Sequence, residues 1–112
     1  MSEAVLTENM IELKIAPLSA IPPGEGRTFS AMGERIAVFR TREGSVFATQ
    51  AECPHRGGPL ADGLLGGSTL ICPLHAWKFD LGTGEPLMGE CGLKTYPARV
   101  DENGDVFLSF GG

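Results

Sequence analysis

The sequence contains no long apolar run. No stretch of its 112 residues approaches the roughly 18 consecutive apolar residues that indicate a transmembrane helix. Its first residues, MSEAVLTENMIELKIAPL, lack the basic segment followed by an apolar segment that makes a signal peptide. We therefore expect neither a signal peptide nor a membrane anchor, and we predict a cytoplasmic location.

Positive charge is also in short supply. Nine Lys and Arg residues stand against 14 Asp and Glu residues, which gives a formal net charge of −5 at pH 7. A nucleic-acid-binding protein needs the opposite balance, because it must neutralise phosphates. The acidic balance instead suits docking onto a basic patch of a larger protein.

Histidine and cysteine are scarce, with two and three residues respectively. Three cysteines cannot all pair, and in a cytoplasmic chain they are expected to be ligands or core residues rather than disulfides. No G-x-G-x-x-G motif follows a predicted strand, so the chain is not expected to bind a nicotinamide or flavin by itself.

Turn-forming residues are abundant, with 16 Gly and eight Pro spread along the chain without a period. Short segments rich in alternating apolar residues predict strands at 11–16, 27–31, 34–40, 45–50, 69–72, 76–80, 95–101 and 104–110. Met32-Gly33 predicts one hairpin. Asn103-Gly104 predicts another, because both residues accept a positive φ. Pro97 predicts that its strand lies at an edge or is bulged. This pattern favours a single all-β domain over residues 1–112, folded as a small antiparallel barrel or sandwich.

Two short loops between predicted strands carry the residues that bind metals. Cys53-x-His55 is followed, after sixteen residues, by Cys72-x-x-His75. Two thiolates and two imidazoles suit either tetrahedral zinc or an iron–sulfur cluster. Zinc fingers usually take two like ligands from each loop, whereas here each loop offers one cysteine and one histidine. Two such loops facing each other would place both cysteines on one iron and both histidines on the other.

The segments CPHRGGPLADG and CPLHAWKFDLGTGEP resemble the Rieske [2Fe–2S] family, and the resemblance extends over about residues 11–110. It implies a cluster-binding part at about residues 51–88 and one [2Fe–2S] cluster per chain. Cys53 and Cys72 would hold the inner iron, and His55 and His75 the outer iron. The turn from Gly82 to Pro86 looks like the family's third covering loop.

Departures from the family pattern indicate a subtype. High-potential members have a disulfide where this chain has Gly58 and Leu74. They also have a Ser and a Tyr that donate hydrogen bonds to the cluster, where this chain has Trp77 and Phe79. Fewer donors stabilise the reduced state less, so we expect a potential near the low end of the family's range, about −150 mV. The third cysteine, Cys91, is predicted to be a core residue rather than a ligand.

The predicted activity is one-electron transfer, with no substrate site on the chain itself. A Rieske oxygenase needs further histidines for a mononuclear iron, and this chain has none beyond the two predicted ligands. Segments 24–26, 36–48 and 93–100 resemble the small subunit of an assimilatory NAD(P)H nitrite reductase, which is the favoured assignment. The alternative is the ferredoxin of an aromatic-ring-hydroxylating dioxygenase. The expected partners are a reductase, a terminal oxygenase or a nitrite reductase large subunit. An alternative of another class is a zinc-bound or metal-free adaptor.

Overall fold

The computed structural model describes residues 10–54, 59–72, 77–88 and 92–111, and the long elements in that part of the chain are all β-strands. The strands are β1 (Met10–Pro17), β2 (Glu25–Ala31), β3 (Glu34–Arg40), β4 (Val46–Gln50), β5 (Leu64–Gly66), β6 (Thr69–Ile71), β7 (Lys78–Asp80), β8 (Pro86–Met88), β9 (Thr95–Tyr96), β10 (Ala98–Val100) and β11 (Asp105–Gly111). Two single 3₁₀ turns accompany them, η1 (Leu18–Ala20) and η2 (Leu60–Asp62). The predicted all-β class is confirmed. Among the described residues no helix has the length and apolarity to cross a membrane.

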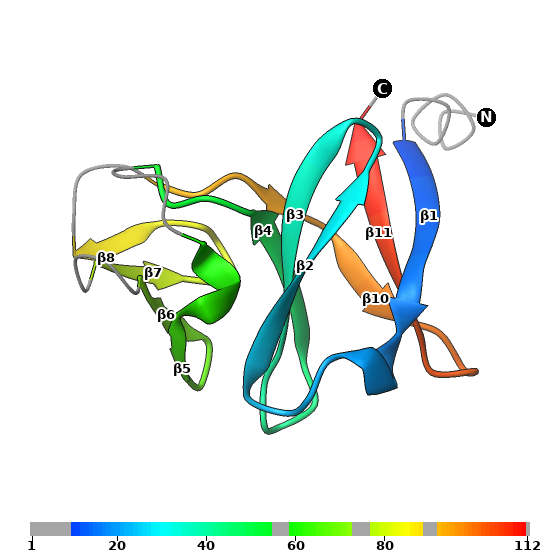
Figure 1. Cartoon of the computed structure of the whole chain (residues 1–112), viewed down its shortest axis with the longest axis horizontal. Helices are drawn as coiled ribbons and strands as arrows, with labels where there is room; N and C mark the ends of the chain where they lie inside the picture. Colours follow the sequence, from blue (N-terminus) through cyan, green and yellow to red (C-terminus); the bar gives the residue numbers. More distant parts are fainter. Residues whose placement is uncertain (1–9, 55–58, 73–76, 89–91, 112) are drawn as a thin grey trace.

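The strands form three antiparallel sheets (Figure 1). Two of them, ordered β1-β11-β10 and β2-β3-β4-β9, make up a basal body. The third, ordered β5-β6-β7-β8, is a small sheet that the chain enters after β4 and leaves before β9. Figure 1 shows this small sheet to one side of the basal body. The predicted antiparallel body with a separate two-loop unit is therefore what the structure shows.

Strand β3 is buried on both faces. Successive side chains of a strand point to opposite faces, and in β3 both sets are apolar. Ile36 and Val38 pack with Val106 and Leu108 in the core of the basal body. The alternate residues of β3, Ala37 and Phe39, belong to a second core that extends into the small sheet. The continuous apolar run of β3 thus joins the two parts of the molecule.

The small sheet supplies the other half of this second core. Leu70 of β6 pairs with Phe79 of β7, and both are fully buried. Leu60 of η2 joins them, and η2 packs against β2 and β3. Strands of three residues bury little surface of their own, so the small sheet depends on this contact with the basal body.

Two of the predicted turns form by different routes. Met32 and Gly33 both have positive φ, at 54° and 73°, as a two-residue hairpin that follows the right-handed twist of its strands requires. In the Asn103-Gly104 turn only Gly104 does, at 81°. There the Asp101 Oδ1 atom accepts hydrogen bonds from the N–H groups of Asn103 (3.0 Å) and Asp105 (2.9 Å). The hairpin was predicted, but the reason given for Asn103 was wrong, because the Asp101 carboxylate organises this turn.

Pro97 divides the strand that the sequence predicts at 95–101. Tyr96 pairs with β4 in one sheet, whereas Ala98 pairs with β11 in the other. Proline lacks the N–H that a continuous ladder needs, so the chain changes sheets at this residue. Both flanking strands lie at the edges of their sheets, as predicted.

Gly63 provides a test of how closely the small sheet packs. A Cβ atom at this position would lie 2.4 Å from the carbonyl oxygen of Ile71. We predict that Gly63→Ala lowers the free energy of unfolding by about 1–3 kcal/mol, because the backbone must shift to relieve the overlap. Urea unfolding of the purified protein measures this.

The matched control is Gly66→Ala. A Cβ atom at Gly66 would have no neighbour within 4 Å, so this variant should unfold at nearly the same urea concentration as the unchanged protein. Equal stability of the two variants would contradict the packing described for Gly63.

Candidate metal centre

The first predicted ligand, Cys53, lies at the start of a loop whose ends are joined. Glu52 and Pro59 form an isolated antiparallel bridge, and the Leu60 N–H donates to the Ala51 carbonyl over 2.9 Å. Cys53 is 2% exposed and belongs to the second core. The thiol is therefore held inside the protein just where the loop leaves the bridge.

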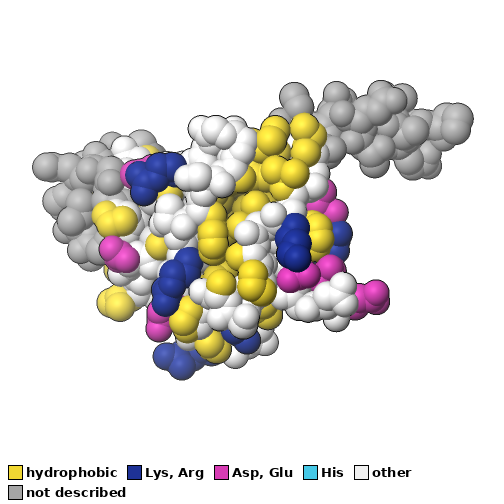
Figure 2. Space-filling model, turned by 45° about the vertical axis from the view of Figure 1, so that its right-hand side comes forward, with side chains coloured by type: hydrophobic (Ala, Val, Ile, Leu, Met, Phe, Trp, Pro, Cys, Tyr) yellow, Lys and Arg dark blue, Asp and Glu magenta, His cyan; other side chains and the backbone are white. Residues whose placement is uncertain are grey.

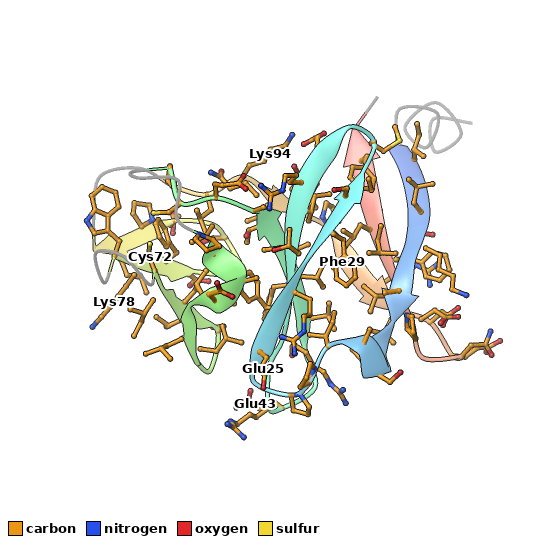
Figure 3. The ribbon with its side chains drawn as sticks, in the orientation of Figure 1. Glu25, Phe29, Glu43, Cys72, Lys78 and Lys94 are labelled. Carbon is orange, nitrogen blue, oxygen red and sulfur yellow. The ribbon has the colours of Figure 1, made fainter. Side chains whose placement is uncertain are left out.

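The second predicted ligand, Cys72, lies in an equivalent place on the small sheet (Figure 3). Ile71 and Lys78 are paired across β6 and β7, and the Cys72 N–H donates to the Trp77 carbonyl over 2.7 Å. Cys72 is 1% exposed and belongs to the same core as Cys53. Two loops from different sheets thus deliver two buried thiols to one apolar core.

A third segment, which contains Gly84 and Leu93, contacts the same core as the two cysteine loops. The Leu93 N–H donates to the Gly84 carbonyl over 2.7 Å, and Leu93 belongs to the core that contains both cysteines. Gly84 has a φ of 81°, and a Cβ atom there would lie 2.3 Å from the Leu93 oxygen. Only glycine allows this approach. The segment predicted as a covering loop is therefore tied to the core by its own backbone.

Two aromatic side chains, Trp77 and Phe79, stand at the positions that correspond, by the sequence resemblance, to the Ser and Tyr of high-potential family members. Phe79 is fully buried in the second core, and the ring of Trp77 packs against that core. The two ring centroids are 6.5 Å apart with a tilt of 51°. Neither ring carries a hydroxyl group, as the sequence indicated, so neither can donate a hydroxyl hydrogen bond on this side of the site.

Several predicted residues lie outside the described part of the chain. These are the ligands His55 and His75, the subtype positions Gly58 and Leu74, and Cys91. Within the described ranges, no group of three or more His, Cys, Asp and Glu side chains is arranged to hold a metal ion. The complete ligand set therefore stays a prediction, and the structure places its two sulfur members.

The described residues fit an iron–sulfur cluster. Cysteine thiolates are its usual ligands, and they must be deprotonated to bind. An isolated thiolate is costly to bury in apolar surroundings, so two buried cysteines are well suited to sharing a cation. A zinc ion would also accept two sulfur ligands. The geometry of the described atoms does not separate these two metals.

Comparison with known proteins distinguishes the iron–sulfur cluster from the zinc ion. Residues 12–97 match the Rieske [2Fe–2S] domain family. The chain is 36% identical over 105 residues to the ferredoxin component of the naphthalene 1,2-dioxygenase/salicylate 5-hydroxylase systems of Ralstonia sp, covering 92% of this chain and 97% of that protein. It spans only 25% of the 4β-methylsterol monooxygenase of Methylococcus capsulatus that it also matches.

Solved structures show the same likeness. The ferredoxin of carbazole 1,9a-dioxygenase from Nocardioides aromaticivorans IC177 superposes with a TM-score of 0.77 at 29% identity, covering 87% of this chain and 95% of that one. A chain assigned as an NADH-dependent nitrite reductase small subunit from Mycobacterium tuberculosis gives a TM-score of 0.85 at 24% identity, covering 92% and 97%. This second likeness concerns the fold alone.

The chain belongs to the Rieske [2Fe–2S] family. Its cofactor is a [2Fe–2S] cluster and its activity is electron transfer, as the sequence predicted.

Among the described residues, several exposed Lys and Arg side chains form ion pairs with Asp or Glu. Lys14 pairs with Asp105, Arg27 with Glu25, Arg35 with Glu52, Lys94 with Glu34, and Arg99 with Glu12. Figure 2 accordingly shows Lys and Arg side chains next to Asp and Glu side chains on the face in view. These pairs are exposed, so each contributes little to stability. Lys94 is exposed, and its ion pair is with Glu34 at 3.0 Å.

One polar cluster at the base of the site includes a buried ring. The Tyr96 hydroxyl donates to the Glu34 carboxylate, and the Lys94 Nζ atom lies 3.0 Å from the same carboxylate. The hydrogen bond from Tyr96, followed by that from Lys94, lowers the pKa of Glu34 below its ordinary value of 4.5. Burial, followed by the bond to Glu34, raises the pKa of Tyr96 above its ordinary value of 10.0.

These shifts predict two limits of stability. Because folding lowers the Glu34 pKa, its contribution is present above pH 4.5 and is lost as the pH falls through the folded value. Because folding raises the Tyr96 pKa, its contribution is present below pH 10.0 and is lost as the pH rises through the folded value. Tyr96→Phe should therefore flatten both limbs of a plot of the urea unfolding midpoint against pH.

Glu34→Gln serves as the partner variant, and it should remove the acid limb that belongs to this cluster. If Tyr96→Phe showed the same alkaline decline as the unchanged protein, the role assigned to Tyr96 would be wrong.

Proposed function

We propose that this chain is the ferredoxin component of an aromatic-ring-hydroxylating oxygenase system, with Cys53, His55, Cys72 and His75 as the ligands of its cluster. One domain would span residues 1–112, with residues 51–88 holding the cluster. The cluster, when bound, supplies a site that accepts and gives up one electron. The protein would receive the electron from a reductase and pass it to a terminal oxygenase in the cytoplasm.

The observation that carries this proposal is the convergence of the two cysteines. Cys53 and Cys72 come from different sheets, each begins a loop with joined ends, and both are buried in one core. A histidine follows Cys53 after one residue and Cys72 after two, so each loop offers an imidazole close to its thiol. This is the ligand order that a cluster with two sulfur and two nitrogen ligands needs.

The surrounding residues suit a low potential. Neutral imidazoles in place of two thiolates make a Rieske cluster easier to reduce than an all-cysteine cluster. Hydrogen bonds to the cluster raise the potential further. Phe79 and Trp77 offer no hydroxyl groups on their side of the site, so these two positions add no hydroxyl hydrogen bond of this kind. A low-potential carrier suits delivery of electrons to an oxygenase.

The relatives favour the oxygenase system over nitrite reduction. Sequence identity of 36% over nearly the full length of both chains links this protein to a dioxygenase ferredoxin component. The nitrite reductase small subunit has the higher TM-score but is only 24% identical, and a shared fold does not imply a shared partner. The nitrite reductase subunit remains the second candidate because of that structural likeness.

The cluster assignment predicts a definite metal content. Protein produced with adequate iron should contain two irons and two sulfides per chain. After reduction with dithionite it should give an EPR signal with an average g value below that of all-cysteine clusters. His55→Ala and His75→Ala should each abolish this signal, because each removes one of the two imidazoles from the outer iron.

Cys91→Ser is the matched control and should keep the full iron content. One zinc per chain would instead favour the adaptor alternative. An unchanged EPR signal in either histidine variant would contradict the proposed ligands.

The partner assignment is tested by the rate of cluster reoxidation. The reduced protein should be oxidised at least about tenfold faster by a naphthalene dioxygenase-type terminal oxygenase than by a sirohaem nitrite reductase subunit, as followed by stopped-flow absorbance. With a net charge of −5 and docking onto a basic patch of the oxygenase, this rate should fall as salt is added. The reverse preference would support the second candidate and reject the first.

A further inference from the structure

The chain connects the basal body and the small sheet at two places only: it enters after β4 through residues 51–53 and returns before β9 through residues 92–94. Figure 1 shows these two connections side by side between the basal body and the small sheet, and Figure 3 places Lys94 there. Cys53 is at the end of the first connection. Any movement of one connection against the other would therefore move a predicted ligand.

Gln50, the last residue of β4, hydrogen-bonds to both connections. Its Nε2 atom donates to the Glu52 carbonyl over 2.8 Å, and its Oε1 atom accepts from the Lys94 N–H over 2.8 Å. Its own backbone N–H donates to the Lys94 carbonyl over 2.9 Å. One side chain thus binds both the nearby Glu52 and Lys94, which is 44 residues further along the sequence than Gln50.

Each partner of Gln50 is adjacent to a residue of the metal site. Glu52 directly precedes Cys53 in the chain. Lys94 directly follows Leu93, which packs in the core with Cys53 and Cys72 and donates its N–H to the Gly84 carbonyl. The Gln50 amide therefore links the cysteine loop to the segment that leads back from the third loop.

The primary amide of Gln50 can make both bonds at once. The position needs a donor toward the Glu52 carbonyl and an acceptor toward the Lys94 N–H, and glutamine provides both on one group. Glutamate would keep the acceptor and lose the donor, while alanine would lose both. The neighbouring Arg35–Glu52 pair is shorter, at 2.6 Å, but its side chains are 63% and 41% exposed. Water competes for that pair; of the two Gln50 side-chain bonds, the one to Glu52 is part-buried and the one to Lys94 is exposed.

We propose that Gln50 is a positioning residue for the cluster: its side-chain amide holds the Cys53 loop against the return segment and keeps water out of the site. This inference rests on the proposed function. Loss of the amide would let the two connections separate more often. Opening would expose the cluster to chelators, so the cluster should be lost faster. Opening would also admit water, which stabilises the more negative, reduced state, so the midpoint potential should rise.

The test compares Gln50→Ala and Gln50→Glu with the control Arg35→Met in the cluster-containing protein. Gln50→Ala should lose its cluster to a chelator about tenfold faster, as expected for loss of one or two hydrogen bonds, and its midpoint potential should rise. Gln50→Glu should also lose its cluster faster, but its added negative charge should lower the potential. Arg35→Met, which removes only the exposed ion pair, should match the unchanged protein in both measurements.

Amide hydrogen exchange in cluster-free protein gives a second readout that does not need the metal. The Lys94 N–H should exchange faster in Gln50→Ala and stay protected in Gln50→Glu, which keeps the acceptor. This also covers the case in which Gln50→Ala fails to fold, because Gln50→Glu then carries the comparison.

The outcomes separate the inference from the proposed function. If the protein without substitutions contained no iron, the proposed function would be rejected. A cluster-containing protein in which the Gln50 variants lose the cluster no faster than Arg35→Met would reject the positioning role alone. The variants could also lose the cluster faster without the potential rising in Gln50→Ala and falling in Gln50→Glu. That result would show that Gln50 has only a general structural role, and it would also overturn the proposal.

Discussion

The contact between Phe39 and the small sheet is the interaction on which the metal site depends. Strands β5, β6, β7 and β8 have three residues each, too few to form a stable sheet by themselves. Phe39 is fully buried among Leu60, Leu70 and Phe79. Gly26 leaves the space for this ring, since a Cβ atom there would lie 2.6 Å from it. The cysteine loops are held because β3 has an apolar residue at every central position and so packs on both sides.

A site built in this way is rigid at its base and apolar inside. The bridge between Glu52 and Pro59 and the bond from Cys72 to Trp77 fix the first residue of each loop. Burial of both cysteines in one core keeps water from the sulfur atoms. A carrier that changes charge by one benefits from a fixed environment, because little of the surroundings must rearrange when the electron arrives or leaves. Gln50 hydrogen-bonds to both connections, and Glu34 bonds to Lys94 on the second one.

The comparisons refine what the motifs imply about partners. The sequence favoured a nitrite reductase small subunit slightly, on the strength of strands that frame the loops. Relatives include both kinds of protein, and full-length identity points to the dioxygenase ferredoxins. The framing strands belong to the shared fold and say little about the partner. Partner choice depends on surface residues near the loops, for which no general sequence rule exists.

The sequence by itself determined the fold class and located strands β1 to β4, β6, β7 and β11, and it predicts one cysteine and one histidine in each ligand loop. These features are local: alternation sets the strands, glycine sets the turns, and ligand spacing lies within four residues. The short strands β5 and β8 were missed, because they lie in Gly- and Pro-rich segments with no apolar alternation to mark them, whereas β6 and β7, equally short, lie in apolar segments.

Only the tertiary structure showed that Pro97 moves the chain between sheets, that Asp101 organises the last turn, and that Gln50 reaches Lys94. Each depends on where a strand or side chain finds its partner. Packing of distant segments decides that, and no local pattern records it.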